Sequence, residues 1–244
     1  MEGSVIQCDT QGGALTSAPL FLAAAHELKS PLALIRQLSL ELESGACTPK
    51  DAEKIARQIT LTTERALRVT TSLTKTARLE DGLFTLEPLN PVSLCEDIVQ
   101  ELGPLYKASG RAIYVAKRSR PMLGLANKDL LRRVLLSFAD NALHYSDDET
   151  PVVVTASLHH GGSRIRLGVR DYGPAVQAKA WNKLARSLGE HPQPLHDRPE
   201  SSGLGIYVAR QFAEAMNAEV GATRHRDGAT FYIDINASSQ LRLL

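Results

Sequence analysis

The sequence has no long apolar run, few aromatic residues and almost no net charge. Its longest apolar run, Ala18–Ala25, has eight residues, far fewer than the roughly 20 that a membrane-spanning helix needs. Aromatic residues make up 5% of the 244 residues, and the net charge is +1. Nucleic-acid binding depends on a basic surface and, for single strands, on aromatic stacking. We therefore expect neither a nucleic-acid partner nor a membrane segment in this chain.

Cysteine is also scarce. Cys8, Cys47 and Cys95 are far apart and form no CxxC pair, which argues against a disulfide framework or a structural zinc site. The first residues lack the basic stretch followed by an apolar one that marks a signal peptide. The sequence therefore predicts a globular protein of the cytoplasm, long enough for one large domain or two modest ones.

Residues 18–82 carry a heptad pattern that predicts two helices joined by a short turn. The expected seam positions are Ala25, Leu28, Leu32, Ile35, Ser39 and Leu42 in the first helix, and Ala52, Ile55, Ile59, Thr62, Ala66, Val69, Leu73 and Thr76 in the second. Thr48 is expected to cap the second helix, with Pro49 in its first turn. One hairpin cannot bury such a seam by itself, so we expect two copies to form a four-helix bundle in a homodimer. The alternative is that the hairpin packs on the rest of its own chain.

A different pattern follows the hairpin. Residues 83–90 predict an extended linker punctuated by prolines, and residues 91–236 predict a second domain. Its expected helices are Ser93–Lys107, Lys128–Tyr145 and Leu204–Met216, and its expected strands are Ala112–Ala116, Met122–Leu125, Val152–His159, Arg164–Val169, Glu219–Arg224 and Thr230–Ile235. Helices with mostly antiparallel hairpins predict an α+β fold, in which the helical hairpin precedes an α/β sandwich. Residues 1–17 and 237–244 are expected to be tails.

His26 is the first residue that a structural role does not explain. It follows the seam position Ala25, so we expect it beside the buried stripe, on the exposed flank of the helix. Glu27 comes next, and Pro31 lies inside the helical run, where a proline normally costs about 3 kcal/mol. An exposed His–Glu pair on a helix is ordinary, so this pattern alone is a moderate signal.

Two polar residues fall on faces that are otherwise apolar. Asn141 lies on the apolar face of its helix, and its amide oxygen suits a hard cation such as Mg²⁺. An asparagine near a helix end more commonly satisfies local backbone groups. Asp171 continues the alternation of Ile165, Leu167 and Val169, so its carboxylate is expected to point inward. A buried carboxylate needs a donor, which either the exocyclic amine of a purine or a structural arginine supplies.

Gly203 and Gly205 open a helix after a long irregular loop, residues 174–202. Glycine lets backbone N–H groups and the positive end of a helix approach a phosphate. The G-x-G pattern is weak by itself, and the Walker pattern GxxxxGK[ST] does not occur in the sequence. A nucleotide site here would therefore have another architecture.

Taken in order, these motifs resemble the catalytic core of bacterial sensor histidine kinases over about residues 18–236. AAAHELKSPLALI resembles the H-box with its phosphoacceptor, His26, and LLSFADNALHYS resembles the N-box. VRDYGPAV resembles the first glycine box, SSGLGIYVARQFAEAMNAEV the second, and GATFYIDI the closing strand. The joint order and spacing of these motifs are far more specific than any one of them.

The resemblance implies a dimerisation and histidine-phosphotransfer hairpin at 18–82 and a Bergerat-type ATP-binding domain at 91–236. It assigns catalytic roles to His26, Glu27 and Ser30. It assigns nucleotide binding to Asn141, His144, Tyr145, Asp171, Gly173, Gly203, Leu204 and Gly205. Asn141 would bind Mg²⁺, and Asp171 would accept a hydrogen bond from the adenine amine. Residues 174–202 would form a lid over the nucleotide, with Lys183, Arg186 and Arg198 as candidate phosphate contacts.

The sequence departs from the family pattern at several positions. Ser30 stands where threonine or asparagine is usual, and its hydroxyl could orient a water for dephosphorylation of the regulator. Ser137 stands where asparagine is common, His144 where lysine is frequent, and Ala175 in place of the second glycine of the first glycine box. These departures bear on catalytic efficiency more than on the fold. Trp181 is the candidate to replace the usual phenylalanines of the lid.

The hypothesis that we favour is an ATP-dependent protein-histidine kinase of two-component signal transduction. It would use ATP and Mg²⁺ to phosphorylate His26, and then pass the phosphoryl group to an aspartate of a response regulator receiver domain. The alternatives are a degenerate relative that binds nucleotide or a response regulator with little autokinase activity, a non-kinase ATPase, and a nucleotide-free dimerising scaffold. About 17 residues precede the hairpin, too few for a sensory domain. We therefore expect either the cytoplasmic part of a membrane sensor or a small cytoplasmic kinase that receives its signal from a partner.

Overall fold

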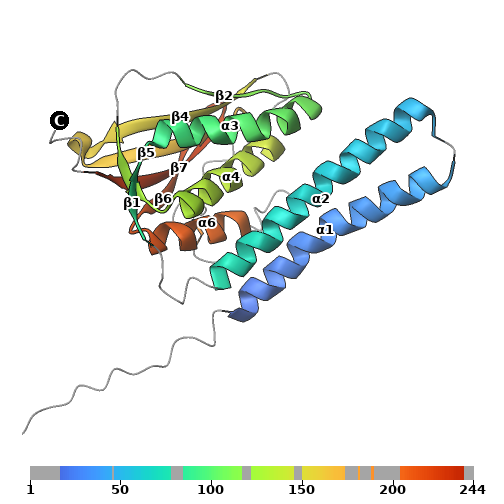
Figure 1. Ribbon diagram of the computed structural model, residues 1–244, viewed down its shortest axis with the longest axis horizontal. Helices are drawn as coiled ribbons and strands as arrows, with labels where there is room; N and C mark the ends of the chain where they lie inside the picture. The colour runs from blue at the N-terminus through green and yellow to red at the C-terminus, as the bar shows by residue number, and fades with distance from the viewer. Residues whose placement is uncertain are drawn as a thin grey trace, which may run out of the picture.

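The computed structural model describes residues 17–45, 47–77, 85–116, 122–145, 150–173, 181, 188–189 and 204–238. Two long helices come first: α1 (Ser17–Glu43) and α2 (Pro49–Ala77). They lie side by side as an antiparallel hairpin (Figure 1). Thr48 caps α2 as expected, because its Oγ1 accepts a hydrogen bond from the Asp51 N–H at 3.3 Å. Among the described residues, no helix has both the length and the apolar character that crossing a membrane requires.

The seam of the hairpin is only partly covered in the single chain. Among the described hairpin side chains, Leu38 and Ile55 are buried, at 7% exposure each, and Leu38 is not an expected seam position. Leu32, which is an expected seam position, is 58% exposed, and Leu67 is 61% exposed. These exposures agree with the expectation that one hairpin cannot bury its seam by itself. The physical reason is that a single antiparallel neighbour covers only one strip of a helix.

The remaining described elements form a sheet with helices on it. The helices are α3 (Pro91–Ala108), α4 (Lys128–Tyr145) and α6 (Leu204–Ala215), with a 3₁₀ turn η2 (His160–Gly162). The strands are β1 (Glu87–Leu89), β2 (Ile113–Val115), β3 (Gly124–Ala126), β4 (Val152–His159), β5 (Arg164–Arg170), β6 (Glu219–His225) and β7 (Gly228–Ala237). This arrangement confirms the predicted α+β class. One difference is that the segment expected to be a linker contains β1.

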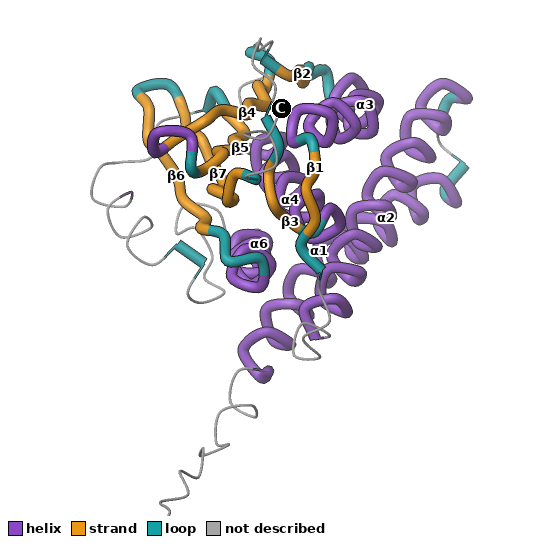
Figure 2. Tube along the Cα trace, turned by 60° about the vertical axis from the view of Figure 1, so that its left-hand side comes forward, coloured by secondary structure: helices purple, strands orange, loops and turns teal. Residues whose placement is uncertain are grey.

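The seven described strands form one sheet in the order β1-β3-β7-β5-β4-β2, and β6 pairs with β7. All pairs are antiparallel except β2 with β4. β7 has β5 along one side, and along its other side β6 and then β3. Helices α3, α4 and α6 lie on one face of the sheet, between the sheet and the hairpin (Figures 1 and 2).

The core lies between the sheet and these helices. The predicted alternation on β5 is confirmed, because Ile165 and Leu167 are fully buried and Val169 is 1% exposed. They face α4, whose start is fixed by Asn127: its Oδ1 accepts the Leu130 N–H at 3.1 Å. The inward-facing side chains of β5, which recur at every second residue, therefore pack in one apolar layer with those of α4, which recur about every 3.6 residues.

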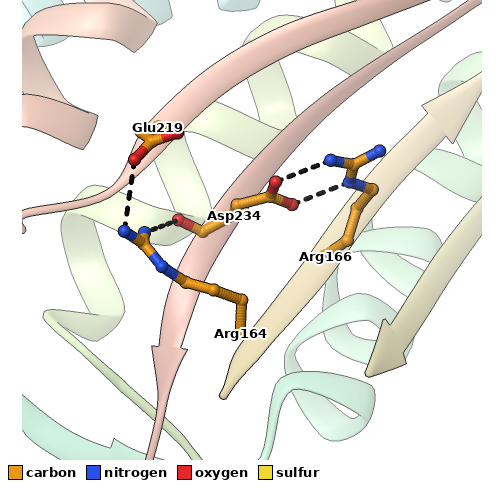
Figure 3. A network of polar contacts seen from close by, with 4 residues as sticks. All are labelled: Arg164, Arg166, Glu219 and Asp234. Carbon is orange, nitrogen blue, oxygen red and sulfur yellow. Dashed lines mark hydrogen bonds and ion pairs between the residues drawn. The ribbon is translucent and has the colours of Figure 1, made fainter. Parts of the chain in front are cut away.

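The opposite face of the sheet carries arginines that are matched by acids. Arg166 donates two hydrogen bonds of 2.7 Å to the two carboxylate oxygens of Asp234, which is only 5% exposed. Arg164 donates to Glu219 Oε1 and to the main-chain oxygen of Asp234, at 3.2 Å each (Figure 3). The guanidinium of Arg166 also lies 3.5 Å from the centre of the Tyr232 ring. These contacts join β5, β6 and β7 on the face opposite α3, α4 and α6.

Gly221 on β6 is where this face has no room for a side chain. A Cβ atom at this position would lie 2.7 Å from Cε2 of Tyr232, and Arg166 holds that ring in place. We expect Gly221→Ala to lower the free energy of unfolding by about 1–3 kcal/mol, because the ring must move. Urea denaturation of the two proteins measures this difference. In a Tyr232→Ser background the same substitution should cost much less, and an equal loss in both backgrounds would contradict the steric explanation.

Candidate functional site

Asp171 lies directly after β5 and is buried, at 5% exposure. The expectation that its carboxylate points inward is confirmed. Its Oδ1 accepts a hydrogen bond of 2.9 Å from the N–H of Ala229, near the start of β7. Its own N–H donates to the main-chain oxygen of Ala229, also at 2.9 Å. One hydrogen bond therefore aligns the carboxylate, and the other fixes the main chain of Asp171 against β7.

Burial raises the pKa of Asp171 above its ordinary value. Hydrogen bonds from the backbone N–H groups of Ala229 and Gly173, and the charge of Arg170, oppose that shift. The result is a hydrogen-bond acceptor in apolar surroundings, where an incoming donor gains more than it would in water. An amine on a flat aromatic base is a donor of the right kind.

A second part of the site lies where α4 meets the beginning of α6. Gly205 is in the first turn of α6, and a Cβ atom on it would lie 2.8 Å from Ser137 Oγ and 4.0 Å from Asn141 Oδ1. The absence of a side chain at Gly205 therefore lets the two helices approach closely. It also places the amide oxygen of Asn141 beside the N-terminal end of α6, where helix N–H groups favour an anion.

Packing holds these two parts of the site together. Phe138 on α4 lies 6.0 Å from Phe231 on β7, measured between ring centres. Tyr106 on α3 donates a hydrogen bond of 2.7 Å to the main-chain oxygen of Ala139. Helix α4 is therefore held against α3 and against β7, the strand that carries Ala229.

The described residues fit a magnesium–nucleotide complex better than a metal held by protein alone. In the part of the chain that the structure describes, no three His, Cys, Asp or Glu residues group as metal ligands. Asn141 offers one hard oxygen near the end of a helix that favours phosphate. Mg²⁺ commonly takes only one or two protein ligands and completes its shell with phosphate oxygens and water.

Several predicted residues lie on these elements or outside the described set. Leu204 is the first residue of α6 and is buried, Gly173 is buried beside Asp171, and Ser30 is exposed on α1. His26 and Glu27 lie within α1, and His144 and Tyr145 end α4, but their side chains are outside the described residues. Gly203, Ala175 and the lid residues Lys183, Arg186 and Arg198 are outside them as well. Trp181, the candidate lid aromatic, is 8% exposed and belongs to the core.

Sequence reasoning missed the contact that joins the hairpin to this site. Arg68 on α2 forms an ion pair with Asp140 at 3.4 Å, and both side chains are 24% exposed. Asp140 directly precedes Asn141 in the chain. Val69, the neighbour of Arg68, packs against the core of the sandwich. The acid beside Asn141 was the one sequence signal for this contact, and it does not reveal a partner 72 residues away.

We expect Asp171→Asn to melt at a higher temperature than the unaltered chain at pH 7. The buried carboxylate is desolvated, whereas an amide carries no charge and its oxygen still accepts the Ala229 N–H. Because the folded pKa is raised, the folded chain takes up the proton first. The difference in melting temperature should therefore shrink as the pH falls toward about 3.9, the pKa of an unfolded aspartate. Thermal melts at a series of pH values measure it, and a difference independent of pH would contradict the assignment.

The contact between Gly205 and Ser137 predicts a coupled pair of substitutions. We expect Gly205→Ala to lower the free energy of unfolding by about 1–2 kcal/mol, despite the better helix propensity of alanine. Ser137→Ala removes the hydroxyl that the new methyl group meets, so the double variant should regain about 0.5–2 kcal/mol. Chemical denaturation of the four proteins completes this cycle. Strictly additive effects would show that the hydroxyl does not limit the approach of the helices.

Residues 126–239 match the family described as histidine kinase-, DNA gyrase B-, and HSP90-like ATPase. The sensor protein KdpD of Mycobacterium tuberculosis is 29% identical over 227 residues, which cover 89% of this chain and 26% of KdpD. The adaptive-response sensory kinase SasA of Prochlorococcus marinus is 25% identical over 223 residues, covering 88% of this chain and 56% of SasA. The chain thus spans between about a quarter and somewhat over half of these two relatives.

Solved structures share the fold over the hairpin and the sandwich together. Full-length ShkA in complex with AMPPNP has a TM-score of 0.59 and 23% identity, covering 89% of this chain and 46% of ShkA. The histidine kinase AdeS of Acinetobacter baumannii also has a TM-score of 0.59, with 16% identity, covering 88% of this chain and 98% of AdeS. Residues 126–239 are therefore similar to an ATPase domain of the type shared by histidine kinases, DNA gyrase B and HSP90, and most of the chain is similar to proteins named as sensor kinases.

Proposed function

We propose that this chain is an ATP-dependent protein-histidine kinase that phosphorylates His26 and passes the phosphoryl group to an aspartate of a response regulator. Two observations support the proposal: Gly205 lies close to Asn141 where α4 meets α6, and the carboxylate of Asp171 is buried and aligned at the end of β5. An acceptor for an amine and a helix end that favours phosphate are the two features that a nucleotide site requires. The relatives named as sensor kinases support the same reading.

The roles of the nucleotide-binding residues follow from their surroundings. Asp171 would accept the exocyclic amine of adenine, because its carboxylate is buried and aligned. The phosphates would lie toward the first turn of α6, past Gly205. Mg²⁺ at Asn141 would supply charge neutralisation for the phosphate oxygens. Phosphoryl transfer needs positioning and electrostatic stabilisation more than covalent chemistry, and these residues would provide both.

His26 on α1 would act as the nucleophile. A ring nitrogen of the neutral imidazole attacks the terminal phosphorus, the bond to the bridging oxygen breaks, and ADP leaves with that electron pair. Glu27 would take the proton from the other ring nitrogen. The phosphohistidine then donates its phosphoryl group to a carboxylate of the receiver domain. Ser30, exposed on the same helix, would orient a water molecule in the reverse reaction.

The hairpin supports a homodimer within this proposal. Leu32, Leu40 and Leu67 are 58%, 49% and 61% exposed in the single chain. A second hairpin would bury such leucines in a four-helix bundle, which gives each one a favourable transfer free energy of about 1.5–3 kcal/mol at full burial. We place the kinase in the cytoplasm, either as the cytoplasmic part of a membrane sensor or as a protein that receives its signal from a partner.

Incubation with Mg²⁺ and γ-labelled ATP tests the proposal. The unaltered chain should retain label that is acid-labile and base-stable, because a phosphoramidate hydrolyses in acid. His26→Gln should retain none. His160→Gln changes an exposed histidine in η2 and is the matched control, which should label like the unaltered chain.

Label that persists in His26→Gln would contradict the assignment of the acceptor. Absence of label with ATP binding confirmed by calorimetry would favour the degenerate relative, with Ser137, His144 and Ala175 as the positions to revert. Phosphate release without any phosphoprotein would instead indicate an ATPase.

A further inference from the structure

Arg170, the last residue of β5, has four partners around its guanidinium. Its side chain is 13% exposed. One terminal nitrogen, Nη1, donates to the main-chain oxygen of Asp171 and, at 3.3 Å, to that of Ala229. The other, Nη2, lies 2.5 Å from Oδ1 of Asp227. The guanidinium also lies 4.3 Å from the ring centre of Tyr172.

Two of these partners, Asp171 and Tyr172, directly follow Arg170 in the chain. The other two, Asp227 and Ala229, lie at the turn between β6 and β7. Gly228 in that turn has φ +126°, a conformation that L side chains rarely adopt. A Cβ atom on it would lie 2.7 Å from Asp171 Oδ1 and 2.9 Å from Arg170 Nη1. The turn therefore rests directly on the carboxylate of Asp171, with Arg170 joining the two.

This arrangement determines how the carboxylate of Asp171 is oriented. Its Oδ1 is bonded to the N–H of Ala229, and Ala229 is held through its oxygen by Arg170 and through the turn by the ion pair of Arg170 with Asp227. Without Arg170, the turn loses these two side-chain contacts and keeps its main-chain ones, among them the 2.9 Å hydrogen bond from the Asp171 N–H to the Ala229 oxygen. The Ala229 N–H would then be held less firmly at hydrogen-bond distance from the carboxylate. Arg170 also places a positive charge near the buried carboxylate and so favours its ionised form.

We propose that Arg170 is a positioning residue for nucleotide-base selection, acting by clamping the β6–β7 turn onto Asp171. The inference rests on the proposed role of Asp171 in base recognition. A carboxylate fixed in this way accepts an amine at the six-position of a purine and repels a carbonyl oxygen there. Arg170 would therefore set the preference of the site for adenine over guanine nucleotides without touching the base itself.

The test is the ratio of ATP affinity to GTP affinity, measured by calorimetry with Mg²⁺ on the full chain. Arg170→Ala should lower this ratio about tenfold, the equivalent of one charge-assisted hydrogen bond that is no longer aligned. Arg170→Lys keeps the positive charge but loses the planar guanidinium with its several N–H donors. It should therefore recover part of the preference for ATP over GTP. A role in stability alone would move the melting temperature and leave the ratio unchanged.

Arg164→Ala is the matched control. Arg164 lies on the same strand and face, and it also bonds an acid, Glu219, and a main-chain oxygen, that of Asp234 (Figure 3). It is at the other end of β5 from Asp171. Its loss should lower the melting temperature and leave the ATP-to-GTP ratio as it is. If Arg170→Ala does not fold, Asp227→Ala, which alters a side chain that is 66% exposed, should lower the ratio about threefold through the same turn.

Asp171→Asn separates this inference from the proposal on which it rests. A ratio that falls in Asp171→Asn and stays unchanged in folded Arg170→Ala, or in Asp227→Ala where that variant replaces it, would overturn the role of Arg170 alone. A ratio that is unchanged in Asp171→Asn would overturn base recognition by Asp171 and with it this inference. An unaltered chain that binds neither nucleotide would overturn both.

Discussion

Helix α4 is buried on nearly every side, and the position of each part of the site follows from that constraint. Its side chains Leu130, Leu131, Val134, Leu135, Phe138 and Ala139 have no exposed surface, because the helix contacts α3, α6 and the sheet. A helix packed at this density cannot rotate without opening voids. Its last turns therefore present Ser137 and Asn141 to α6 and Asp140 to the hairpin, in fixed directions. The packing that buries the apolar side chains of α4 therefore also fixes the directions of its polar side chains.

Local sequence patterns predicted most of the fold, because helix caps and the bounds of helices and strands depend on residues that are close together in the chain. Asn127 and Thr48 cap helices in the structure as their positions in the sequence suggest, and the bounds of β4 and α4 match the expected ones. Two features were missed. β1 follows from pairing with a distant strand, β3, and its prolines suggested a linker. Leu38 is buried where the heptad pattern placed Ser39 in the seam, since that pattern does not say which strip of a helix its neighbour will cover.

The candidate site could be predicted in its residues but not in its supports. The alternation along β5 shows that Asp171 points inward, yet Ala229, which orients its carboxylate, is 58 residues away. Arg170 occupies a strand position that reads as solvent-facing, and only the folded turn between β6 and β7 gives it partners. Ser137 reads as a departure from a family pattern. In the structure its hydroxyl is the atom nearest to where a side chain at 205 would begin. Contacts of this kind join elements that the chain separates, so no short pattern records them.

The order of strands also determines how the molecule would respond to mechanical force. β1 is the first described element after the hairpin, and it is joined to the sheet by three residue pairs with β3 alone. β3 in turn has two residue pairs with β7, whereas β5 has seven with β7 and seven with β4. A pull along the connection from the hairpin first loads β1, an edge strand held by few residue pairs. Tension would therefore be released at this edge before it reached the strands that carry Asp171 and Ala229.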